Sequence, residues 1–509
     1  MPQWCGPTSR VSSEDFGLVG DDATDNTQRL EVLRQYLIEH DRTAVDFAAG
    51  NYRYTNFEWL HGVRNVMLRG VGAVGFRNVC KSPWDIRRVT LMANADMLTG
   101  PESIPEMGVA TPYLIESADA GERTLRLLSS GPVADIQPGR PLLICGYNQY
   151  NGGWPPCLRY SEFATAASVD WNQRLITLNT PLVHSYRSNW PSQKFKTQSF
   201  GPAAIVPLQR TGSSPFQLGE HHIYDNITFL ESPTGPAYTN RDGLGGLYTM
   251  GVRFLEVRNC KMAFFGPNEN QWVKVTNCTI GSTELGKMVG AVEILNSSVD
   301  SIGEASAVEL LIIRDTNISR FLSLAPSRLV MTGNTIKSSY LGRSISLGAF
   351  TSSTHIDKAF IANNTFVLPE GSQSGSLVIV PRPHTVTLTR PLSSGFATPT
   401  SSAWSFLGSV SLGNRVFDKS GANAVIKDIV AAGDDTEVRT AGPSLDTTGG
   451  PLSVRCVGTL IFFGNHVIGT PLKQIEDANR VEELITSEMA EEDAFHSDYV
   501  NLGRAPVPC

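Results

Sequence analysis

The feature that most limits the folds open to this chain is an asparagine that recurs through its second half. Each asparagine lies at or near the end of a short run rich in Val, Ile, Leu, Phe and Thr, which are residue types that favour β-strands. From Asn259 the next asparagines follow after 18, 19, 21 and 17 residues, and the later gaps of 30, 50 and 51 residues indicate coils with inserted loops or missed repeats. The recurring positions are Asn226, Asn259, Asn277, Asn296, Asn317, Asn334, Asn364, Asn414 and Asn465.

A period of about 20 residues is typical of a solenoid. Asparagine tolerates the left-handed backbone of a tight turn, and its amide can donate and accept along a stack. We therefore expect an all-β chain, a right-handed parallel β-helix with an inward asparagine ladder. Leucine-rich repeats are the main rival, but their LxxLxL pattern is absent. Four of the asparagines lie in N-x-S/T triplets, which would suit glycosylation if they were exposed, whereas the ladder needs them to face inward: Asn226, Asn277, Asn296 and Asn317.

The N-terminal segment predicts a helix followed by short strands. A helix can begin near Asp25–Thr27, and Leu30, Leu33 and Leu37 then share one face. The pattern DFG-x-x-GD-x-x-TD-x-T, followed by this helix and by V-x-F-x-x-G-x-Y, resembles the N-terminal signature of the pectate-lyase-like superfamily. That superfamily includes polysaccharide lyases, polygalacturonase-like hydrolases, epimerases and phage tailspike depolymerases. The resemblance implies a β-helix whose open end is covered by an N-terminal capping helix.

The domain organisation follows from the repeat and the resemblance. Residues 115–200 break the coil rhythm and resemble a small β-rich insert, with a hairpin turn at Asp170–Asn172. The tail from Lys473 to about Glu492 predicts an acidic helix with an apolar stripe. The expected parts are the cap and first coils (1–114), the insert (115–200), the β-helix (201–470) and a C-terminal helical cap or tail (471–509).

Composition argues against several classes of partner. The formal net charge is −7 and no basic cluster stands out, so we expect no nucleic-acid partner. No run of 18 apolar residues exists, which predicts no membrane span, and the first residues lack a signal-peptide pattern. The eight cysteines show no CxxC spacing, so we expect no metal site, and we favour buried thiols over disulfides. By resemblance, the protein is expected to be secreted or virion-associated and to form a homotrimer.

The candidate active site comes from strand alternation. If the ladder asparagines face inward, the residue three positions before each one faces outward. Glu256, Lys274, Glu293 and Arg314 then stack on successive rungs about 4.8 Å apart. This row can be a surface salt-bridge ladder, or it can be a wall that supplies acid, base and cation to a glycan.

Further candidates lie in loops around the same coils. Asp242 and Glu269 are additional catalytic candidates because each sits in a polar cluster just before a strand. The pair His221–His222 can act as base or ligand, but turn or core packing is the favoured interpretation. The substrate-binding candidates are Arg241, Glu304, Arg314 and the aromatic residues of the insert loop, Tyr147, Tyr150 and Trp154, which can instead pack locally.

The expected function is cleavage of a polysaccharide in a β-helix groove. β-Elimination by a polysaccharide lyase is the first expectation. The alternatives are a glycoside hydrolase or intramolecular glycosyl transferase that uses paired carboxylates, and a non-catalytic virion spike or adhesin that only binds glycan. No cofactor is expected, except that a lyase could use Ca²⁺.

Overall fold

A computed structural model gives the architecture of the chain. It describes residues 6–55, 60, 62–79, 89–91, 113–128, 132–133, 136–139, 141–149, 157–190, 193–195, 198–200, 203–207, 219–231, 243–250, 252–268, 270–285, 289–303, 308–320, 322–337, 344–347, 356–368, 376–381, 383–399, 414–448, 451–469, 473–476 and 478–486.

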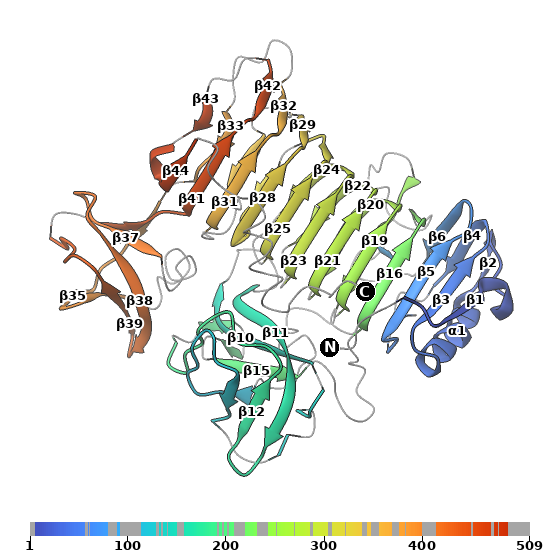
Figure 1. Cartoon of the computed structure of the whole chain (residues 1–509), viewed down its shortest axis with the longest axis horizontal. Coiled ribbons are helices and arrows are strands. Elements are labelled where there is room, and N and C mark those ends of the chain that lie inside the picture. Colours follow the sequence, from blue (N-terminus) through green and yellow to red (C-terminus); the bar gives the residue numbers. More distant parts are fainter. Residues whose placement is uncertain are drawn as a thin grey trace.

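The described chain forms a right-handed parallel β-helix, as the repeat predicted (Figure 1). Its coils stack into two long parallel sheets, here called sheet A and sheet B. Sheet A has twelve strands, in the order β1 (Ser9–Ser12), β3 (Thr43–Phe47), β5 (Asn65–Gly70), β16 (Gly219–Asp225), β19 (Val252–Arg258), β21 (Asn270–Thr276), β23 (Val289–Leu295), β25 (Val308–Arg314), β28 (Arg328–Thr332), β31 (Ile356–Ala362), β41 (Val457–Phe463) and β44 (Val481–Ile485).

Sheet B supplies the second wall of each coil. Its seventeen strands are β2 (Asp21–Asp25), β4 (Gly50–Tyr54), β6 (Val74–Asn78), β7 (Val89–Leu91), β17 (Thr228–Leu230), β18 (Gly246–Met250), β20 (Lys261–Asn268), β22 (Thr279–Glu284), β24 (Ser298–Gly303), β26 (Asn317–Ile318), β27 (Leu322–Leu324), β29 (Thr335–Lys337), β30 (Ile345–Leu347), β32 (Thr365–Val367), β33 (Ser376–Ile379), β42 (His466–Ile468) and β43 (Lys473–Glu476).

The core lies between the two sheets and repeats in register. Val257, Val275 and Ile294 occupy matched positions on β19, β21 and β23, and all three are fully buried. Met262 and Ile280, matched on β20 and β22 of sheet B, belong to the same core cluster. Because alternate residues of a strand point to opposite faces, the neighbours of these core residues in sheet A point outward.

The N-terminal end carries the predicted helix, α1 (Thr27–Glu39), which lies beside the first strands (Figure 1). Leu30, Leu33 and Leu37 are buried, as their spacing predicted. The buried Asn26 fixes the turn before α1: its amide donates to the carbonyls of Val19, Thr24 and Arg53 at 2.9–3.2 Å and accepts from the Val19 amide at 2.9 Å.

The turn between the sheets uses two adjacent positions, which corrects the single inward ladder that we predicted. The first position has a left-handed backbone and is exposed, and it holds Asn226, Asn259, Asn277, Asn296, Asp315, Gly333, Asn363 and Gly464. The next position faces the core and holds Ile227, Cys260, Cys278, Ser297, Thr316, Asn334, Asn364 and Asn465. The prediction of inward asparagines is therefore right for Asn334, Asn364 and Asn465 and wrong for the first four and for the exposed Asn317.

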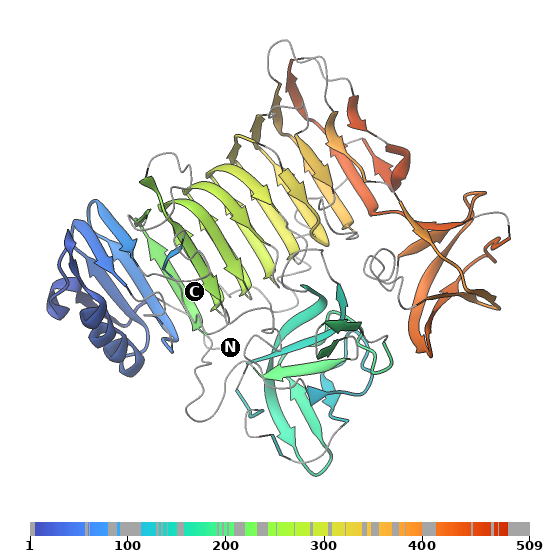
Figure 2. The same ribbon diagram turned by 180° about the vertical axis from the view of Figure 1, so that it is seen from behind.

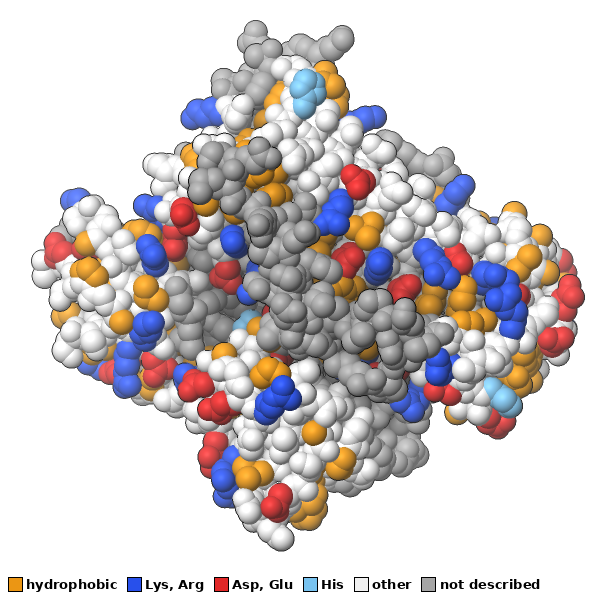
Figure 3. Space-filling model, viewed as in Figure 1, with side chains coloured by type: hydrophobic (Ala, Val, Ile, Leu, Met, Phe, Trp, Pro, Cys, Tyr) orange, Lys and Arg blue, Asp and Glu red, His pale blue; other side chains and the backbone are white. Residues whose placement is uncertain are grey.

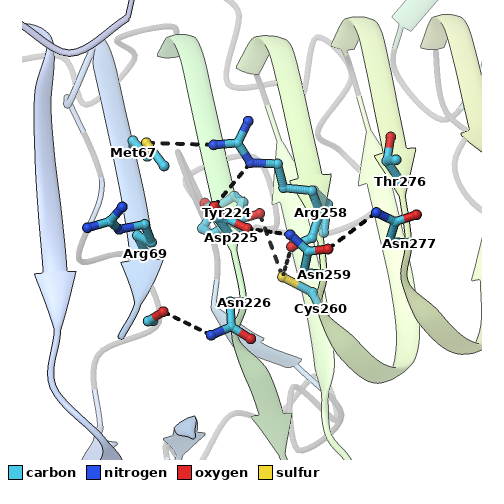
Figure 4. A network of polar contacts seen from close by, with 12 residues as sticks. Met67, Arg69, Tyr224, Asp225, Asn226, Arg258, Asn259, Cys260, Thr276 and Asn277 are labelled. Atoms are coloured by element: carbon cyan, nitrogen blue, oxygen red, sulfur yellow. Dashed lines mark hydrogen bonds and ion pairs between the residues drawn. The ribbon is translucent and has the colours of Figure 1, made fainter. Parts of the chain in front are cut away.

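The exposed asparagines still form a ladder, but on the outside of the turn. The amide of Asn259 donates to Asp225 at 2.8 Å, that of Asn277 to Asn259 at 3.4 Å and that of Asn296 to Asn277 at 3.1 Å. Figure 4 shows the first two of these contacts, together with the ion pair between Asp225 and Arg258 at 3.2 Å. Asparagine thus satisfies both the backbone geometry and the stacking of side chains.

A first insert interrupts the stack between β7 and β16. It is a six-stranded antiparallel sheet of β8 (Tyr113–Leu114), β9 (Thr124–Arg126), β10 (Pro141–Gln149), β11 (Cys157–Asp170), β12 (Leu175–Leu178) and β15 (Ala204–Pro207). A hairpin joins β11 to β12, and Asp170 accepts the amides of Asn172 and Gln173 in its turn. The hairpin lies where Asp170–Asn172 predicted a turn.

A second insert was not predicted, because we interpreted the long gaps between asparagines in 201–470 as coils with inserted loops or missed repeats. It is a seven-stranded antiparallel sheet of β34 (His384–Val386), β35 (Arg390–Leu392), β36 (Gly395–Pro399), β37 (Arg415–Phe417), β38 (Asn423–Ala432), β39 (Asp435–Ala441) and β40 (Leu452–Val454). Asn414 therefore precedes a strand of this insert and is not a rung of the stack. Figures 1 and 2 show both inserts on the same side of the stack.

The C-terminal helix that we predicted is wrong within the described residues. Lys473–Glu476 and Val481–Ile485 are strands of sheets B and A, joined by a short 3-10 turn at Ala478–Arg480. Val481 packs into the core at the end of the stack. The apolar residues of this segment therefore belong to a β-strand and do not form one face of a helix. Among the described residues, no helix is long and apolar enough to cross a membrane.

Candidate functional site

The candidate site lies on the outer face of sheet A, where three charged residues stand on successive strands. Glu256 on β19 is opposite Lys274 on β21, and Lys274 is opposite Glu293 on β23. We call these three residues the charged file. Two steps of about 4.8 Å place the backbones of the two glutamates about 10 Å apart, with the lysine between them.

The charged file interrupts a run of apolar residues on the neighbouring strands. Ile223 precedes Glu256 in register, and Ile312, Val330 and Phe360 follow Glu293 on the next strands. All four apolar side chains are buried, although they point outward from sheet A. Lys274 is exposed and Glu256 is half-buried, whereas Glu293 is buried at 8% exposure, so solvent reaches the charged file mainly at Lys274.

Arg314 does not continue the charged file, which corrects our prediction. Ile312 is opposite Glu293, and Arg314 is opposite Leu295 in the neighbouring row. The error comes from Asn317, which lies two residues beyond the left-handed turn position at Asp315. Counting three residues back from Asn317 therefore reached the wrong row.

A histidine that we had assigned to packing completes the site. The Nε2 atom of His221 lies 3.0 Å from Oε1 of Glu256, and the His221 side chain is nearly buried beside Phe254. Its neighbour His222 is fully buried and hydrogen-bonds through Nε2 to the Val63 carbonyl at 2.9 Å. Burial lowers the pKa of His222 to about 4, so this ring is neutral in the core.

The alternation of the strand distinguishes the two histidines. His222 is opposite the core residue Leu255, and His221 is opposite Phe254, whose side chain lies in the outer cluster of sheet A. Strand parity could have shown this in the sequence, because His221 is two residues before Ile223 in the outward row. The packing prediction is right for His222, and for His221 it missed the contact with Glu256.

Glu256 is the residue whose charge state is best defined. Burial alone would raise its pKa, but the hydrogen bond with His221 and the positive charges of His221, Arg258 and Lys274 outweigh that effect. The pKa of Glu256 is therefore lowered from its ordinary value, and the side chain is a carboxylate at neutral pH. A carboxylate in this state can accept a proton or bind a cation, but it cannot act as a general acid.

Lys274 is an exposed cation between two glutamates. Within the described part of the chain, no ion pair of 4.0 Å or less joins its ammonium group to Glu256 or Glu293. Arg258, by contrast, is paired with Asp225 in the neighbouring row. Lys274 is thus placed to meet a negatively charged group of a ligand.

Several predicted residues cannot be placed at this site. Tyr147 lies on β10 of the first insert, where only the backbone is described. A contact that we did not predict joins the first insert to the stack, where Nε2 of His184 lies 3.5 Å from Oε1 of Glu309 at the start of β25. The remaining candidates lie outside the described residues: Arg241, Asp242, Glu269, Glu304, Tyr150 and Trp154.

One face of the molecule has mixed charge. On the face drawn in Figure 3, the described Lys and Arg side chains are interspersed with Asp and Glu, without a large area of one sign. A long anionic polymer would therefore be bound by local groups such as Lys274 and not drawn in from a distance.

Comparison with known proteins finds similarity only at the level of solved structures. No family model and no curated protein matches the sequence. Solved structures similar to this chain include the tailspike gp49 of Pseudomonas phage LKA1, at 13% identity and a TM-score of 0.31, covering 94% of this chain and 79% of that one. The tailspike gp61 of Pseudomonas phage phi297 has 12% identity and a TM-score of 0.32, covering 87% and 98%.

A third similar structure is the gp54 tailspike of Acinetobacter baumannii bacteriophage AP22 in complex with capsular saccharide. It has 8% identity and a TM-score of 0.24, and the match covers 87% of this chain and 95% of that one. Likenesses at these TM-scores carry no argument about function. The β-helix assignment rests on the strand register of this chain, which has the fold that the sequence resemblance implied.

Proposed function

We propose that the protein cleaves a polysaccharide bound across the outer face of sheet A, with the charged file as its active site. The observation that carries this proposal is the pairing in register of an ionised Glu256 with Glu293 two strands away. A glycoside hydrolase requires two carboxyl groups that flank the scissile bond. The sequence resemblance supplies the substrate class.

Hydrolysis with inversion fits this arrangement best. Inverting enzymes hold their two carboxyl groups roughly 6.5–9.5 Å apart, leaving room for a water molecule. The backbones of Glu256 and Glu293 are about 10 Å apart, and their side chains can lean toward each other. In this proposal Glu256 accepts a proton from water, Glu293 protonates the leaving oxygen, and His221 holds Glu256 in place.

β-Elimination is the second candidate, and the observation that favours it is Lys274, whose ammonium group forms no ion pair with the charged residues that the structure describes. A lyase must neutralise the carboxylate of a uronic acid while a base removes the adjacent proton. Lys274 would supply the cation and Glu256 the base. Ca²⁺, if it participates, would share the neutralising role.

The test is a set of variants assayed on a panel of neutral and acidic polysaccharides, reading new reducing ends and the ultraviolet absorbance of unsaturated products. For hydrolysis, Glu256→Gln and Glu293→Gln each lower the rate by about 10²–10⁴-fold, whereas Lys274→Ala has a smaller effect. Glu483→Gln and Lys358→Ala are matched controls, because these residues are exposed on distant strands of the same sheet.

The outcomes separate the candidates. Unsaturated products, strong dependence on Lys274 and a requirement for Ca²⁺ after EDTA treatment would indicate a lyase. Glycan binding without any cleavage would indicate a spike or adhesin. If cleavage occurs and no charged-file variant lowers its rate by more than about tenfold, the active site lies elsewhere.

We also propose that the protein works outside the cell, secreted or on a virion, as a homotrimer. Both expectations follow from the sequence resemblance. Sedimentation equilibrium of the intact chain measures the assembly directly, and a monomer mass at micromolar concentration would contradict it.

A further inference from the structure

Two cysteines stack directly on each other in the core beneath the candidate site. Cys260 and Cys278 occupy the same inward turn position on consecutive coils, and each is at most 2% exposed. The amide of Thr279 donates to the carbonyl of Cys260 at 2.9 Å, which holds the two coils in register at this point. The next coil carries Ser297 at the same position, so a hydroxyl group also fits this ladder.

The side chain of Cys278 approaches the coil that carries Cys260. The amide of Cys260 donates to Sγ of Cys278 at 3.4 Å, and the Cys278 thiol lies 3.5 Å from the carbonyl of Val257 on the Cys260 coil. The sulfur of Cys278 therefore leans toward Cys260. Adjacent strands are about 4.8 Å apart, which lies within the span of roughly 4.4–6.8 Å between the Cα atoms of disulfide-bonded cysteines.

We propose that Cys260 and Cys278 form an oxidative modification site, a dithiol that hydrogen peroxide converts into a disulfide between two coils. The Cys278 thiolate attacks peroxide, the O–O bond breaks, and hydroxide leaves and is protonated to water, which gives a sulfenic acid. The sulfur of Cys260 then attacks Cys278, and the displaced hydroxide leaves as water with the Cys260 proton. The two sulfur atoms are oxidised and the peroxide oxygens are reduced.

The surroundings assign different roles to the two thiols. The hydrogen bond from the Cys260 thiol, together with the Cys260 amide, lowers the pKa of Cys278 from its ordinary value. Burial raises the pKa of Cys260 well above its ordinary value. The geometry agrees, because Sγ of Cys278 accepts the Cys260 amide at 3.4 Å, which favours a thiolate, whereas the Cys260 thiol faces the carbonyls of Arg258 at 3.2 Å and Tyr224 at 3.6 Å. Cys278 is therefore the attacking thiolate and Cys260 the resolving thiol.

The disulfide would act on the part of the stack that carries the charged file. Cys260 follows Glu256 by four residues, and Cys278 follows Lys274 by four residues. A bond between the sulfur atoms would tie these two coils together and fix the separation of Glu256 and Lys274. The redox proposal stands without any catalytic role for these residues.

The test treats the reduced, full-length protein with hydrogen peroxide, blocks the remaining thiols after unfolding and identifies cross-linked peptides by mass spectrometry. We expect a Cys260–Cys278 cross-link that forms slowly, because both thiols are buried, and that dithiothreitol reverses. In Cys260→Ser, Cys278 stops at the sulfenic acid and is trapped by dimedone. In Cys278→Ser, Cys260 labels with dimedone at least about tenfold more slowly.

The Ser297 position shows that both serine variants fit the ladder, and circular dichroism confirms their folding. Cys456→Ser is the matched control, since Cys456 is also buried, and it leaves the cross-link unchanged. The proposal is overturned if both thiols remain fully alkylatable after peroxide has oxidised added glutathione, or if either forms its disulfide mainly with another cysteine. Equal dimedone labelling of the two serine variants would overturn the assigned roles.

Discussion

At the scale of single residues, the charge on Glu256 depends on His221. The pKa of Glu256 is lowered, so its ionised form stabilises the folded state above the ordinary value of 4.5. That stabilisation is lost as the pH falls below 4.5 through the lowered folded value. We therefore expect the difference in melting temperature between the wild type and Glu256→Gln to shrink between about pH 7 and pH 3.

The variant His221→Asn tests the cause of this behaviour. Without the imidazole, burial is the largest remaining influence and raises the pKa of Glu256 above its ordinary value, so the pH dependence reverses sign: the ionised side chain destabilises the folded state, and that cost disappears as the pH falls. Melting curves of the wild type, His221→Asn and Glu256→Gln across this range measure both effects. A pH-independent difference between the wild type and Glu256→Gln would contradict the lowered pKa.

Part of the site could be predicted at this scale. Strand alternation gave Glu256, Lys274 and Glu293, because three consecutive coils have nearly equal length. It failed for Arg314, where an aspartate replaces asparagine at the turn. The contact between His221 and Glu256 crosses 35 residues of sequence, so it could be found only by knowing which strands are neighbours.

At the scale of the element, the two turn positions have different tolerances. Asn364 faces the core, where its amide donates to Met331, Ala362 and Asn465 at 3.0 Å. Asn363 is exposed in the left-handed conformation that Gly464 adopts on the next coil. We expect Asn364→Ala to lower the free energy of unfolding by about 2–4 kcal/mol and Asn363→Gly to change it by less than about 0.5 kcal/mol.

Urea unfolding of the two variants measures this difference on adjacent residues. Equal destabilisation would show that the core amide ladder contributes nothing specific. The sequence could not separate the two positions, because asparagine suits both of them: one needs its backbone tolerance and the other its amide. The error in our ladder prediction arose from this double use.

At the scale of the whole molecule, the two inserts touch although they are far apart in sequence. Arg187 of the first insert pairs with Asp119 at 2.6 Å and approaches Asp428 of the second insert at 3.9 Å. The amide of Ala431 donates to the carbonyl of Asn189 at 3.1 Å across the same contact. We expect Arg187→Ala to speed hydrogen exchange at Ala431 by about tenfold or more without affecting the stack.

Hydrogen exchange followed by mass spectrometry measures this effect, with the amides of β21 as the internal reference. Arg390→Ala is the matched control, because Arg390 pairs with Glu437 inside the second insert. Unchanged protection at Ala431 would show that the Arg187 contact does not hold the inserts together. The sequence indicated the first insert because residues 115–200 depart from the coil repeat. It did not indicate the second insert, because the long gaps between asparagines there were equally compatible with loops inserted in the coils.

The first insert also has a consequence for how the chain is made. β5 pairs directly with β16, yet roughly 150 residues separate them. At a translation rate of about 5–20 residues per second, the ribosome needs roughly 8–30 s after completing β5 to synthesise its partner strand β16. During that interval the edge of β5 that later pairs with β16 has no partner strand. We therefore expect chaperones that prevent aggregation during synthesis to matter most for roughly the first 80 residues.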